Sequence, residues 1–367
     1  MPKPPPMGVE EGNRVGRKDF RRILVRANNW IGDVVMISPA MRSLRERFPE
    51  AEITILAKPW VLEALEGSSL FDRLLPYDKR RQHAGVRGFL KMVAELRRCR
   101  FDCAVLFQNA FEAALLTYLA RIPTRIGYAT DGRSPLLTKA IPLRPDSWYR
   151  RHRGEEFLDL IEFLGCERNG GPTDFPLPAS GPASARLSLR PGRAVRVALH
   201  PGASKGAKAW HPDRFAEVGS RLQETLGAEI LLLGGPGEKS LIDSIGRCMP
   251  TPPLTLPEPA GVKRLAIHLN SCDLLIGNDS GPMHIAGALG IDVIGIFGPG
   301  SPRRTGPFRP RSQFVPVTAG FPCAPCRQRF FQECDPLPSG KPPCLEVISV
   351  EEVMREALRL LGNRRQA

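Results

Sequence analysis

Four short stretches of the chain combine ionisable side chains with glycines, each directly after an apolar run. Asp33 ends the stretch NNWIGD (28–33), and Lys208 lies in HPGASKGAKAW (200–210). The stretches GGPGE (234–238) and GNDSGPMH (277–284) follow two later apolar runs in the same way. Glycine-rich turns that open a helix leave N–H groups accessible to an anion, and a nearby lysine adds positive charge. The three later stretches therefore indicate a nucleotide diphosphate site, and Asp33 is a candidate general base.

Each of these residues also has a simpler interpretation. Asp33 lies where a helix begins, so it is equally suited to cap that helix, and the residues alone favour capping. Lys205 and Lys208 are consistent with two solvated lysines on a loop. Asn278, Asp279 and Ser280 are all common capping residues, and His284 is compatible with a packed core histidine. The G-x-x-x-x-G-K-[ST] spacing of a P-loop does not occur after residue 200.

Four of the nine cysteines lie close together, in the pattern C-x2-C-x7-C-x9-C. Thiols at such spacing are able to hold a structural Zn²⁺. The alternatives are free thiols or a disulfide, and a catalytic role is not indicated because no histidine lies in this segment. The four residues are Cys323, Cys326, Cys334 and Cys344.

The elements that must position these residues alternate between strands and helices. Residues 23–28, 52–57, 103–107 and 124–128 read as strands, and the spacing from Val34 to Phe48 predicts one helix ending before Pro49. Helices are also expected near 86–98 and 111–120. After residue 193 the alternation resumes, which predicts two α/β halves with parallel sheets. The later strands are expected at 194–200, 228–234, 272–279 and 292–298, and the later helices near 212–225, 238–247, 261–270, from 281, and 350–361.

The Pro- and Gly-rich segment before Ala194 is the strongest linker candidate. Two α/β halves separated by a hinge indicate an enzyme with a cleft, in which ligands bind at the carboxyl ends of the strands. The expected divisions are a disordered basic extension (1–20), an N-terminal domain (21–175), a linker (176–193), a C-terminal domain (194–349) and a C-terminal helix (350–367).

Composition excludes several classes of protein. The chain has 367 residues, 42% of them hydrophobic and 25% charged, which are ordinary values for a globular protein of about two domains. No apolar run reaches the roughly 18 residues of a membrane-spanning helix, and the N-terminus lacks the apolar core of a secretory signal. The formal net charge of +14 calls for an anionic partner, and no RNA- or DNA-binding motif accompanies it. We expect a cytoplasmic protein.

Taken together, the motifs resemble those of the ADP-heptose:lipopolysaccharide heptosyltransferases, glycosyltransferase family 9. The segment from Asn29 to Trp60, NWIGDVVMISPAMRSLRERFPEAEITILAKPW, is similar to the N-terminal signature of that family, and FQNAFEAALLTYLARIPTRIGY to the segment that follows. HPGASKGAKAWHPDRFAEV and CDLLIGNDSGPMHIAGALGIDVIGIFGPGSP resemble its C-terminal signatures. The resemblance covers residues 23–361 and preserves the motif order. The forms of the first and third segments lean toward the members called heptosyltransferase II.

The resemblance implies a GT-B fold, in which two Rossmann-like domains face a central cleft, with an acceptor-binding N-terminal domain (21–175) and a nucleotide-sugar-binding C-terminal domain (194–349). It also implies an inverting, metal-independent transfer from ADP-L-glycero-D-manno-heptose, with no cofactor. It assigns Asp33 as the base, Lys208 to the departing diphosphate and Asp279 to the donor sugar, and so reverses the capping interpretation of Asp33. Donor binding falls to residues of the C-terminal half, with Glu238 at the ribose. These nucleotide-sugar-binding residues are Gly202, Gly234, Gly235, Glu238, Asn278, Ser280, Gly281 and His284.

The expected partners are ADP-heptose and an acceptor, either Kdo-lipid A or heptosyl-Kdo-lipid A. Basic stretches such as residues 149–153 and Arg21–Arg22 suggest contact with phosphorylated lipid or with the anionic surface of the inner membrane. We therefore expect peripheral association with that membrane and no nucleic-acid partner. Two hypotheses compete: a GT-B sugar-nucleotide epimerase, for which no further acid/base pair is found, and a basic binder without enzymatic activity.

Overall fold

The structure is a computed structural model that describes residues 19–143, 151–177, 194–235, 237–256, 261–326, 331 and 334–366. Nearly all of the expected N-terminal extension and linker thus lies outside the described residues. The described chain divides into two compact units. The first comprises residues 19–62, 68–143 and 153–171, and the second comprises residues 63–67, 151–152 and the chain from 172 onward.

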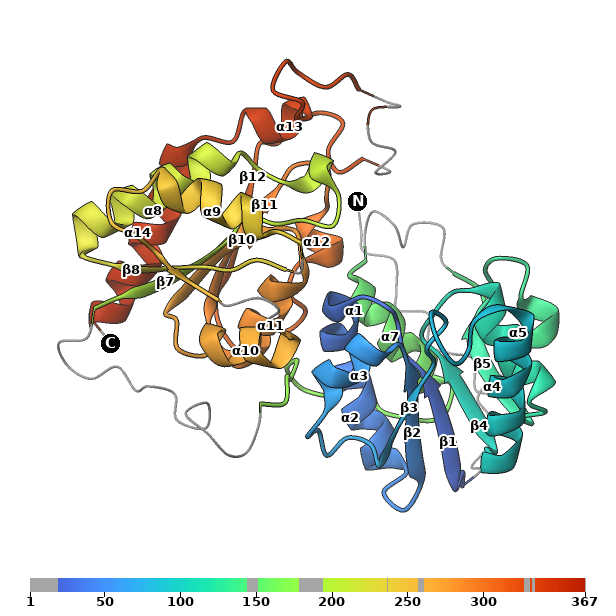
Figure 1. Ribbon diagram of the computed structural model, residues 1–367. Helices are drawn as coiled ribbons and strands as arrows, with labels where there is room; N and C mark the ends of the chain where they lie inside the picture. Colours follow the sequence, from blue (N-terminus) through green and yellow to red (C-terminus); the bar gives the residue numbers. More distant parts are fainter. Residues whose placement is uncertain are drawn as a thin grey trace, which may run out of the picture. The chain divides into compact units, whose positions relative to one another are not determined.

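The first unit contains a six-stranded parallel sheet in the order β3-β2-β1-β4-β5-β6 (Figure 1). Helices α1, α2 and α7 pack together, and α4 packs with α5. The strands are β1 (Arg22–Arg26), β2 (Glu52–Ala57), β3 (Arg73–Pro76), β4 (Cys103–Leu106), β5 (Thr124–Tyr128) and β6 (Lys139–Ile141). The helices are α1 (Ile31–Met36), α2 (Ser38–Arg47), α3 (Pro59–Leu65), α4 (Gly85–Cys99), α5 (Phe111–Leu119) and α7 (Arg153–Glu162), with a 3-10 turn η2 (Ser134–Leu136).

The second unit repeats this topology with the order β12-β11-β10-β7-β8-β9, again with parallel neighbours. Helices α8, α9 and α14 lie on one side of the sheet, and α10 and α11 lie on the other (Figure 1). The strands are β7 (Arg196–His200), β8 (Glu229–Leu232), β9 (Leu254–Thr255), β10 (Leu274–Asn278), β11 (Asp292–Phe297) and β12 (Phe314–Thr318). The helices are α8 (Pro212–Leu226), α9 (Lys239–Arg247), α10 (Val262–Leu269), α11 (Gly281–Leu289), α12 (Pro302–Thr305), α13 (Pro343–Glu346) and α14 (Val350–Gln366), with a 3-10 turn η3 (Gly206–Lys208).

Each sheet has one point at which the strand order reverses. In the first unit this switch point lies between β1 and β4, and in the second it lies between β7 and β10. Helices that leave neighbouring strands toward opposite faces open a crevice beyond the carboxyl ends at such a point, and ligands of doubly wound sheets bind there. Asp33, Lys208 and Asp279 lie in the segments that directly follow β1, β7 and β10. The expected site residues therefore lie at the two switch points.

The two parallel sheets confirm the predicted Rossmann-like fold of each half, and most predicted elements are present within one or two residues. The four strands that the sequence did not indicate, β3, β6, β9 and β12, are the outermost strands of the two sheets. Their residues are mostly half-buried or exposed. Edge strands are covered on fewer sides, so they lack the continuous apolar pattern that identified the central strands.

The single helix predicted from Val34 to Phe48 is wrong, because the structure contains two helices that meet at Ile37. Pro39 is the second residue of α2. A proline lacks the N–H group that an uninterrupted helix would need at this position, and it is favoured in a first turn. The break gives α1 only six residues, so Asp33 and its neighbours lie in a short helix of their own.

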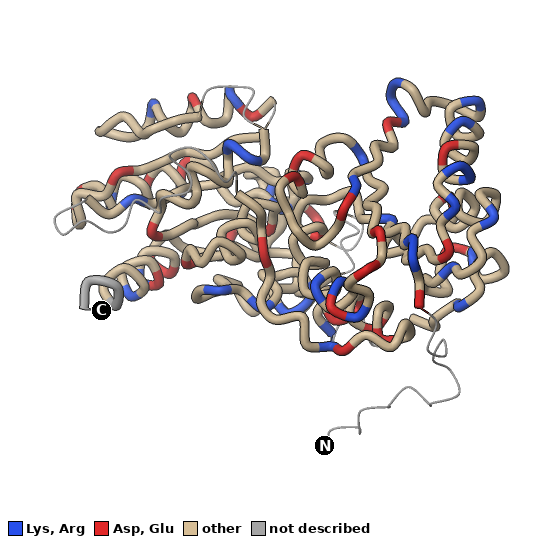
Figure 2. Tube along the Cα trace, turned by 90° about the horizontal axis from the view of Figure 1, so that it is seen from below, with Lys and Arg blue, Asp and Glu red and all other residues tan. Residues whose placement is uncertain are grey.

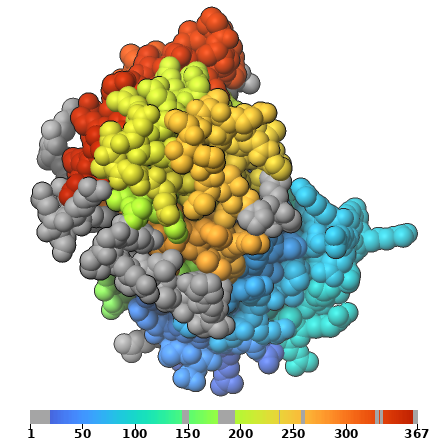
Figure 3. Space-filling model, turned by 60° about the vertical axis from the view of Figure 1, so that its left-hand side comes forward, coloured from blue at the N-terminus to red at the C-terminus, as the bar shows by residue number. Residues whose placement is uncertain are grey.

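Each unit has its own apolar core. The core of the first unit lies between the sheet and helices α4 and α5, and includes Leu24, Met92 and Leu106. The core of the second unit reaches from β7 to the C-terminal helix α14, whose Val353 and Leu360 are buried in it. Figure 3 shows this C-terminal segment, coloured red, directly against the yellow-green surface that includes α8. The expected C-terminal helix is therefore an integral part of the second unit.

Charged residues are spread over both units. Figure 2 shows Lys and Arg residues interspersed with Asp and Glu along most of the trace. Within the described residues, the structure contains no helix with the length and apolarity needed to cross a membrane. The excess of positive charge is thus distributed, and its local concentrations have to be sought at particular loops.

Candidate active site

Asp33 is held at the switch point of the first sheet by two side chains. It is the third residue of α1, and the extended residue before the helix, Trp30, occupies the cap position. Asn28 Nδ2 donates to Asp33 Oδ2 at 2.9 Å, and Arg153 Nε donates to Asp33 Oδ1 at 2.7 Å. The carboxylate is 8% exposed. Asp33 is not the cap of its helix, and its two oxygens are engaged by groups from other parts of the unit.

Arg153 reaches Asp33 from the first residue of α7. Its guanidinium also lies 3.8 Å from Glu156 Oε2 and 5.5 Å from the ring centroid of Phe157. Burial lowers the pKa of Arg153, but the charges of Asp33 and Glu156 outweigh it, so that the pKa is raised overall. The sequence indicated Arg153 only as part of a basic stretch suited to phosphate or to a membrane surface. It did not predict the ion pair with Asp33. Nothing local could have indicated it, because 120 residues separate the two partners.

Asn28 is buried, and one of its two polar side-chain atoms has no hydrogen-bond partner among the described residues. Asn28 is 3% exposed, and the atom in question is Oδ1. A buried polar atom without a partner costs about 1–3 kcal/mol. The amide is therefore oriented toward Asp33 at the expense of its own carbonyl oxygen. Such local costs are characteristic of functional sites.

A group of basic side chains surrounds Trp60 at the same edge of the first sheet. Lys58 Nζ lies 4.7 Å from the Trp60 ring centroid, and the Arg80 guanidinium lies 5.8 Å from it. Trp60 is 40% exposed, and its Nε1 donates to the carbonyl oxygen of Asn29 at 3.3 Å. The pKa of Lys58 is lowered by burial and by the nearby charges of Arg26, Arg80 and Lys79. This local excess of positive charge, next to an exposed indole, was not found from the sequence.

In the second unit, Lys208 and Asp279 meet across the switch point. Lys208 ends η3 after β7, and Asp279 follows β10. Lys208 Nζ donates to Asp279 Oδ2 at 2.6 Å, and Thr305 Oγ1 lies 3.4 Å from Asp279 Oδ1. Both charged side chains are largely buried, whereas Lys205 is exposed. The structure thus distinguishes between the two lysines that the sequence left equivalent.

Ser280 precedes α11 in extended conformation, but its side chain does not cap the helix. Ser280 Oγ donates to the carbonyl oxygen of Asn278 at 3.0 Å and lies 3.1 Å from His200 Nδ1. Burial lowers the pKa of His200, partly opposed by the charge of Glu238. The first N–H groups of α11, beginning at Gly281, are therefore not occupied by the Ser280 hydroxyl. His284 lies further along the same helix and is buried.

Asn278 joins the loop after β7 to the end of β10. It is fully buried; its Nδ2 donates to the carbonyl oxygen of Pro201 at 2.8 Å, and its Oδ1 accepts from the backbone N–H of Trp210 at 3.0 Å. Its amide is thus occupied by the loop that carries Lys208. This geometry suits a residue that shapes the loop carrying Lys208 better than one that contacts a nucleotide directly.

Gly202, Gly235 and Glu238 form the contact between the loops after β7 and β8. Glu238 Oε2 accepts a hydrogen bond from the backbone N–H of Gly235 at 2.6 Å. A Cβ at Gly202 would overlap the Glu238 carboxylate, and one at Gly234 would lie 2.8 Å from Ile242 Cγ1. The glycines are needed here because they let the two loops and the carboxylate approach each other closely.

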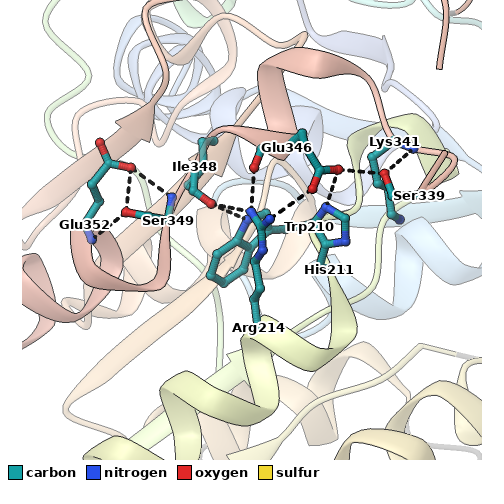
Figure 4. Close-up of polar contacts among 9 residues, drawn as sticks. All are labelled: Trp210, His211, Arg214, Ser339, Lys341, Glu346, Ile348, Ser349 and Glu352. Carbon is teal, nitrogen blue, oxygen red and sulfur yellow. Dashed lines mark hydrogen bonds and ion pairs between the residues drawn. The ribbon is translucent and has the colours of Figure 1, made fainter. Parts of the chain in front are cut away.

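A polar network fixes the chain immediately after Lys208 to the C-terminal segment (Figure 4). Trp210 Nε1 donates to the carbonyl oxygen of Ile348 at 3.1 Å, and His211 Nε2 lies 3.0 Å from Glu346 Oε2. Arg214 donates to the Glu346 side chain at 3.0 Å and to the carbonyl oxygens of Glu346 and Ile348 at 2.7 and 2.6 Å. These contacts join the chain that follows Lys208 to a segment more than 130 residues away.

The four clustered cysteines come near one another in the second unit. Burial raises the pKa of Cys344 to about 11, and Cys323, Cys326 and Cys334 contribute to the increase. All four are free thiols. Among the described residues, no group of three or more His, Cys, Asp or Glu side chains is arranged to hold a metal ion. The described residues therefore do not support the zinc site that the spacing suggested, because the sulfurs lie near one another without forming a set of metal ligands.

The fold and the loops at its switch points define a class of enzyme: the chain is a glycosyltransferase with the GT-B type of fold. The model of glycosyltransferase family 9 (heptosyltransferase) matches residues 89–333, and the chain belongs to this family.

Three known proteins illustrate the similarity. Lipopolysaccharide heptosyltransferase 2 of Escherichia coli is 26% identical over 316 residues, which cover 82% of this chain and 89% of that protein. The crystal structure of a glycosyl transferase family 9 protein from Veillonella parvula has a TM-score of 0.78 at 23% identity, covering 94% of this chain and 98% of the other. The E. coli heptosyltransferase WaaC, solved with ADP, has a TM-score of 0.70 at 17% identity and covers 92% of this chain and 99% of the other.

Proposed function

We propose that this protein is an inverting heptosyltransferase that moves L-glycero-D-manno-heptose from ADP-heptose to the inner core of lipopolysaccharide. The position of transfer is the second heptose, as the name of its E. coli relative suggests. The observation that carries the proposal is the pair of buried, ionisable sites at the two switch points. These are Asp33 with Arg153 in the first unit, and Lys208 with Asp279 in the second.

In the proposed reaction, Asp33 is the general base. An acceptor hydroxyl is a weak nucleophile, and removal of its proton as the new bond forms strengthens it. The hydroxyl oxygen forms a bond to the anomeric carbon of the heptose while the bond from that carbon to the β-phosphate oxygen breaks. The proton passes to Asp33, and the electron pair leaves with ADP. Attack opposite the leaving group inverts the configuration at the anomeric carbon.

The second unit stabilises the leaving group in this proposal. The ammonium of Lys208 has three donors, so it can keep its bond to Asp279 and still bind a phosphate oxygen. The first N–H groups of α11, after Ser280, supply dipole and hydrogen bonds to the same diphosphate. A lysine and a helix N-terminus meet the requirement for positive charge, which supports a metal-independent reaction. The relative solved with ADP fits a donor of this kind.

The remaining residues have supporting roles in the proposal. Asp279 orients the donor sugar and Lys208, and Glu238 faces the ribose across Gly202. Gly234 and Gly235 shape the same loop, Gly281 admits the phosphates, and His284 packs behind them. Asn278 maintains the loop that carries Lys208.

The acceptor in this proposal is an anionic saccharide on a lipid. Positive charge is concentrated near the edge of the sheet that carries Asp33. Lys58 and Arg80 lie over the Trp60 ring, and Lys79 is close enough to affect the charge of Lys58. Carboxylate and phosphate groups of a Kdo-lipid A core are suited to such a surface, and an exposed indole is able to stack on a sugar ring. A lipid-borne acceptor also implies work at the cytoplasmic face of the inner membrane, where anionic lipid attracts basic side chains.

The test is transfer from ADP-heptose to a panel of truncated Kdo-lipid A acceptors, with and without EDTA. Transfer to a mono-heptosylated acceptor that survives EDTA is the expected result. Transfer only to a heptose-free or to a longer acceptor would keep the reaction and overturn the position. Turnover of the donor without any acceptor would favour an epimerase, and the absence of both reactions would overturn the proposal.

A further inference from the structure

We propose that Arg153 is a positioning residue for the general base: together with Asn28, it holds the Asp33 carboxylate in one orientation. This inference rests on the proposed function of Asp33. It assigns Arg153 a role in the reaction although the residue lies at the start of α7, outside the motifs that resemble the family signatures.

The guanidinium is braced on several sides. Its central carbon lies 5.5 Å from the centroid of the Phe157 ring, and Phe157 packs edge-on against Phe107, just beyond β4, with ring centroids 5.4 Å apart. Glu156 lies on another side, 3.8 Å from Nη1. With its long side chain supported in this way, Arg153 presents Nε to Asp33 Oδ1 in a short, charge-assisted hydrogen bond of 2.7 Å.

Arg153 is the charged partner of Asp33. Asp33 is almost completely buried, and a buried carboxylate needs a cation or hydrogen-bond donors in direct contact with it. Among the described residues, Arg153 is the cation in contact with Asp33, at 2.7 Å. Glu156 and Tyr128 also act on the charge of Arg153, and the Tyr128 hydroxyl donates to the carbonyl oxygen of Glu156 at 2.8 Å.

The two donors also fix the orientation of the carboxylate. One hydrogen bond reaches each oxygen, from Arg153 to Oδ1 and from Asn28 to Oδ2. The carboxylate plane is then defined, and each oxygen retains a lone pair with which to accept the proton of the acceptor hydroxyl. A base restrained in this way is already aligned when the acceptor binds, which lowers the cost of reaching the reactive geometry.

A merely structural role for Arg153 is less consistent with the surroundings of α7. That helix is already tied by Arg168, which pairs with Glu155 at 2.6 Å, with Glu162 at 3.1 Å, and with Asp159. Arg168 therefore supplies the ion pairs that stabilise the helix, whereas Arg153 directs its Nε away from the helix to Asp33. The same contrast provides a matched control, because both arginines pair with carboxylates of α7 and only Arg153 contacts Asp33.

The experiment compares Arg153→Ala, Arg153→Lys and the control Arg168→Ala in the full chain. For Arg153→Ala we expect kcat to fall about 100-fold, the loss typical of a misplaced reacting group, while KM for ADP-heptose changes little. Arg153→Lys should restore part of the rate, since it returns the charge without the fixed geometry. Arg168→Ala should lower the melting temperature and leave kcat nearly unchanged.

A second readout does not depend on turnover. Crystal structures of the unaltered chain, Arg153→Ala and Arg168→Ala report the orientation of the Asp33 carboxylate. The carboxylate should turn in Arg153→Ala and keep its orientation in Arg168→Ala. An unchanged kcat and an unchanged carboxylate in Arg153→Ala, or an equal loss of kcat in Arg168→Ala, would overturn the inference. If the unaltered chain transfers no heptose, the proposed function fails, and the orientation of the carboxylate still decides whether Arg153 positions Asp33.

Discussion

Lys208 and Asp279 form a 2.6 Å ion pair although they follow different strands and are 71 residues apart. The pair is formed because β7 and β10 are neighbours at the reversal of strand order, so the loops after them converge. Lys208, on a glycine-rich loop, therefore lies at the carboxyl edge of the sheet. The position of this ion pair thus follows from the topology of the sheet.

Substitution of Asp33 tests the assignment of the base. In Asp33→Asn the side chain keeps its size but cannot accept the proton, so transfer should fall at least about 100-fold. Binding of ADP, measured by calorimetry, should remain nearly unchanged because the donor loops lie in the second unit. Asp72→Asn, which alters a surface ion pair of the same unit, is the control. Normal turnover in Asp33→Asn would remove Asp33 from the reaction.

Substitution of Lys208 tests the diphosphate contact. A hydrogen bond to a charged group contributes about 1.5–3 kcal/mol, so Lys208→Ala should weaken ADP binding by roughly 10- to 100-fold and slow transfer. The matched control is Lys205→Ala, three residues earlier in the same loop, where the side chain is exposed. Equal effects of the two variants would mean that the loop acts only through its overall charge.

The contact between Gly202 and Glu238 offers a steric test. A methyl group at residue 202 would overlap the Glu238 carboxylate and displace it, so Gly202→Ala should raise KM for ADP-heptose. Gly206→Ala is the control in the same loop, because a Cβ there meets nothing within 4 Å. Both variants should unfold cooperatively near the temperature of the unaltered chain. A KM that is unchanged in Gly202→Ala would separate Glu238 from donor binding.

The network around Glu346 predicts a pH dependence of stability. The hydrogen bond from Ser339, together with His211 and Arg214, lowers the pKa of Glu346. A carboxylate with a lowered pKa in the folded state stabilises the protein above its ordinary pKa, and this contribution is lost as the pH falls through the folded value. Glu346→Gln should therefore unfold at a lower temperature at pH 7, by a small margin because the carboxylate is partly exposed.

The difference in melting temperature between Glu346→Gln and the unaltered chain should vanish as the pH falls below the usual range of a glutamate. The comparison is Glu351→Gln, which removes an exposed ion pair between Glu351 of α14 and Arg221 of α8. A difference that persists in acid would mean that the network acts through shape and packing, without a contribution from the charge of Glu346.

The sequence by itself determined the central architecture and indicated the candidate ionisable residues. Apolar runs such as 274–277 mark strands buried on both faces, and glycines after them mark the turns at their carboxyl ends. This pattern is local, so it can be read from consecutive residues. It located Asp33, Lys208 and Asp279, and it predicted two Rossmann-like sheets, which the structure confirms.

Tertiary structure alone decided which partners these residues have. Arg153 reaches Asp33 across 120 residues, and Asn278 is turned toward the loop at Trp210 across 68. The sequence also left the four cysteines open between a zinc site, a disulfide and free thiols; the structure contains no disulfide between them, and among the described residues no group of side chains is arranged to hold a metal ion. Contacts of this kind depend on how strands are ordered within a sheet. Strand order is settled by the packing of the whole unit, so no short stretch of residues carries it.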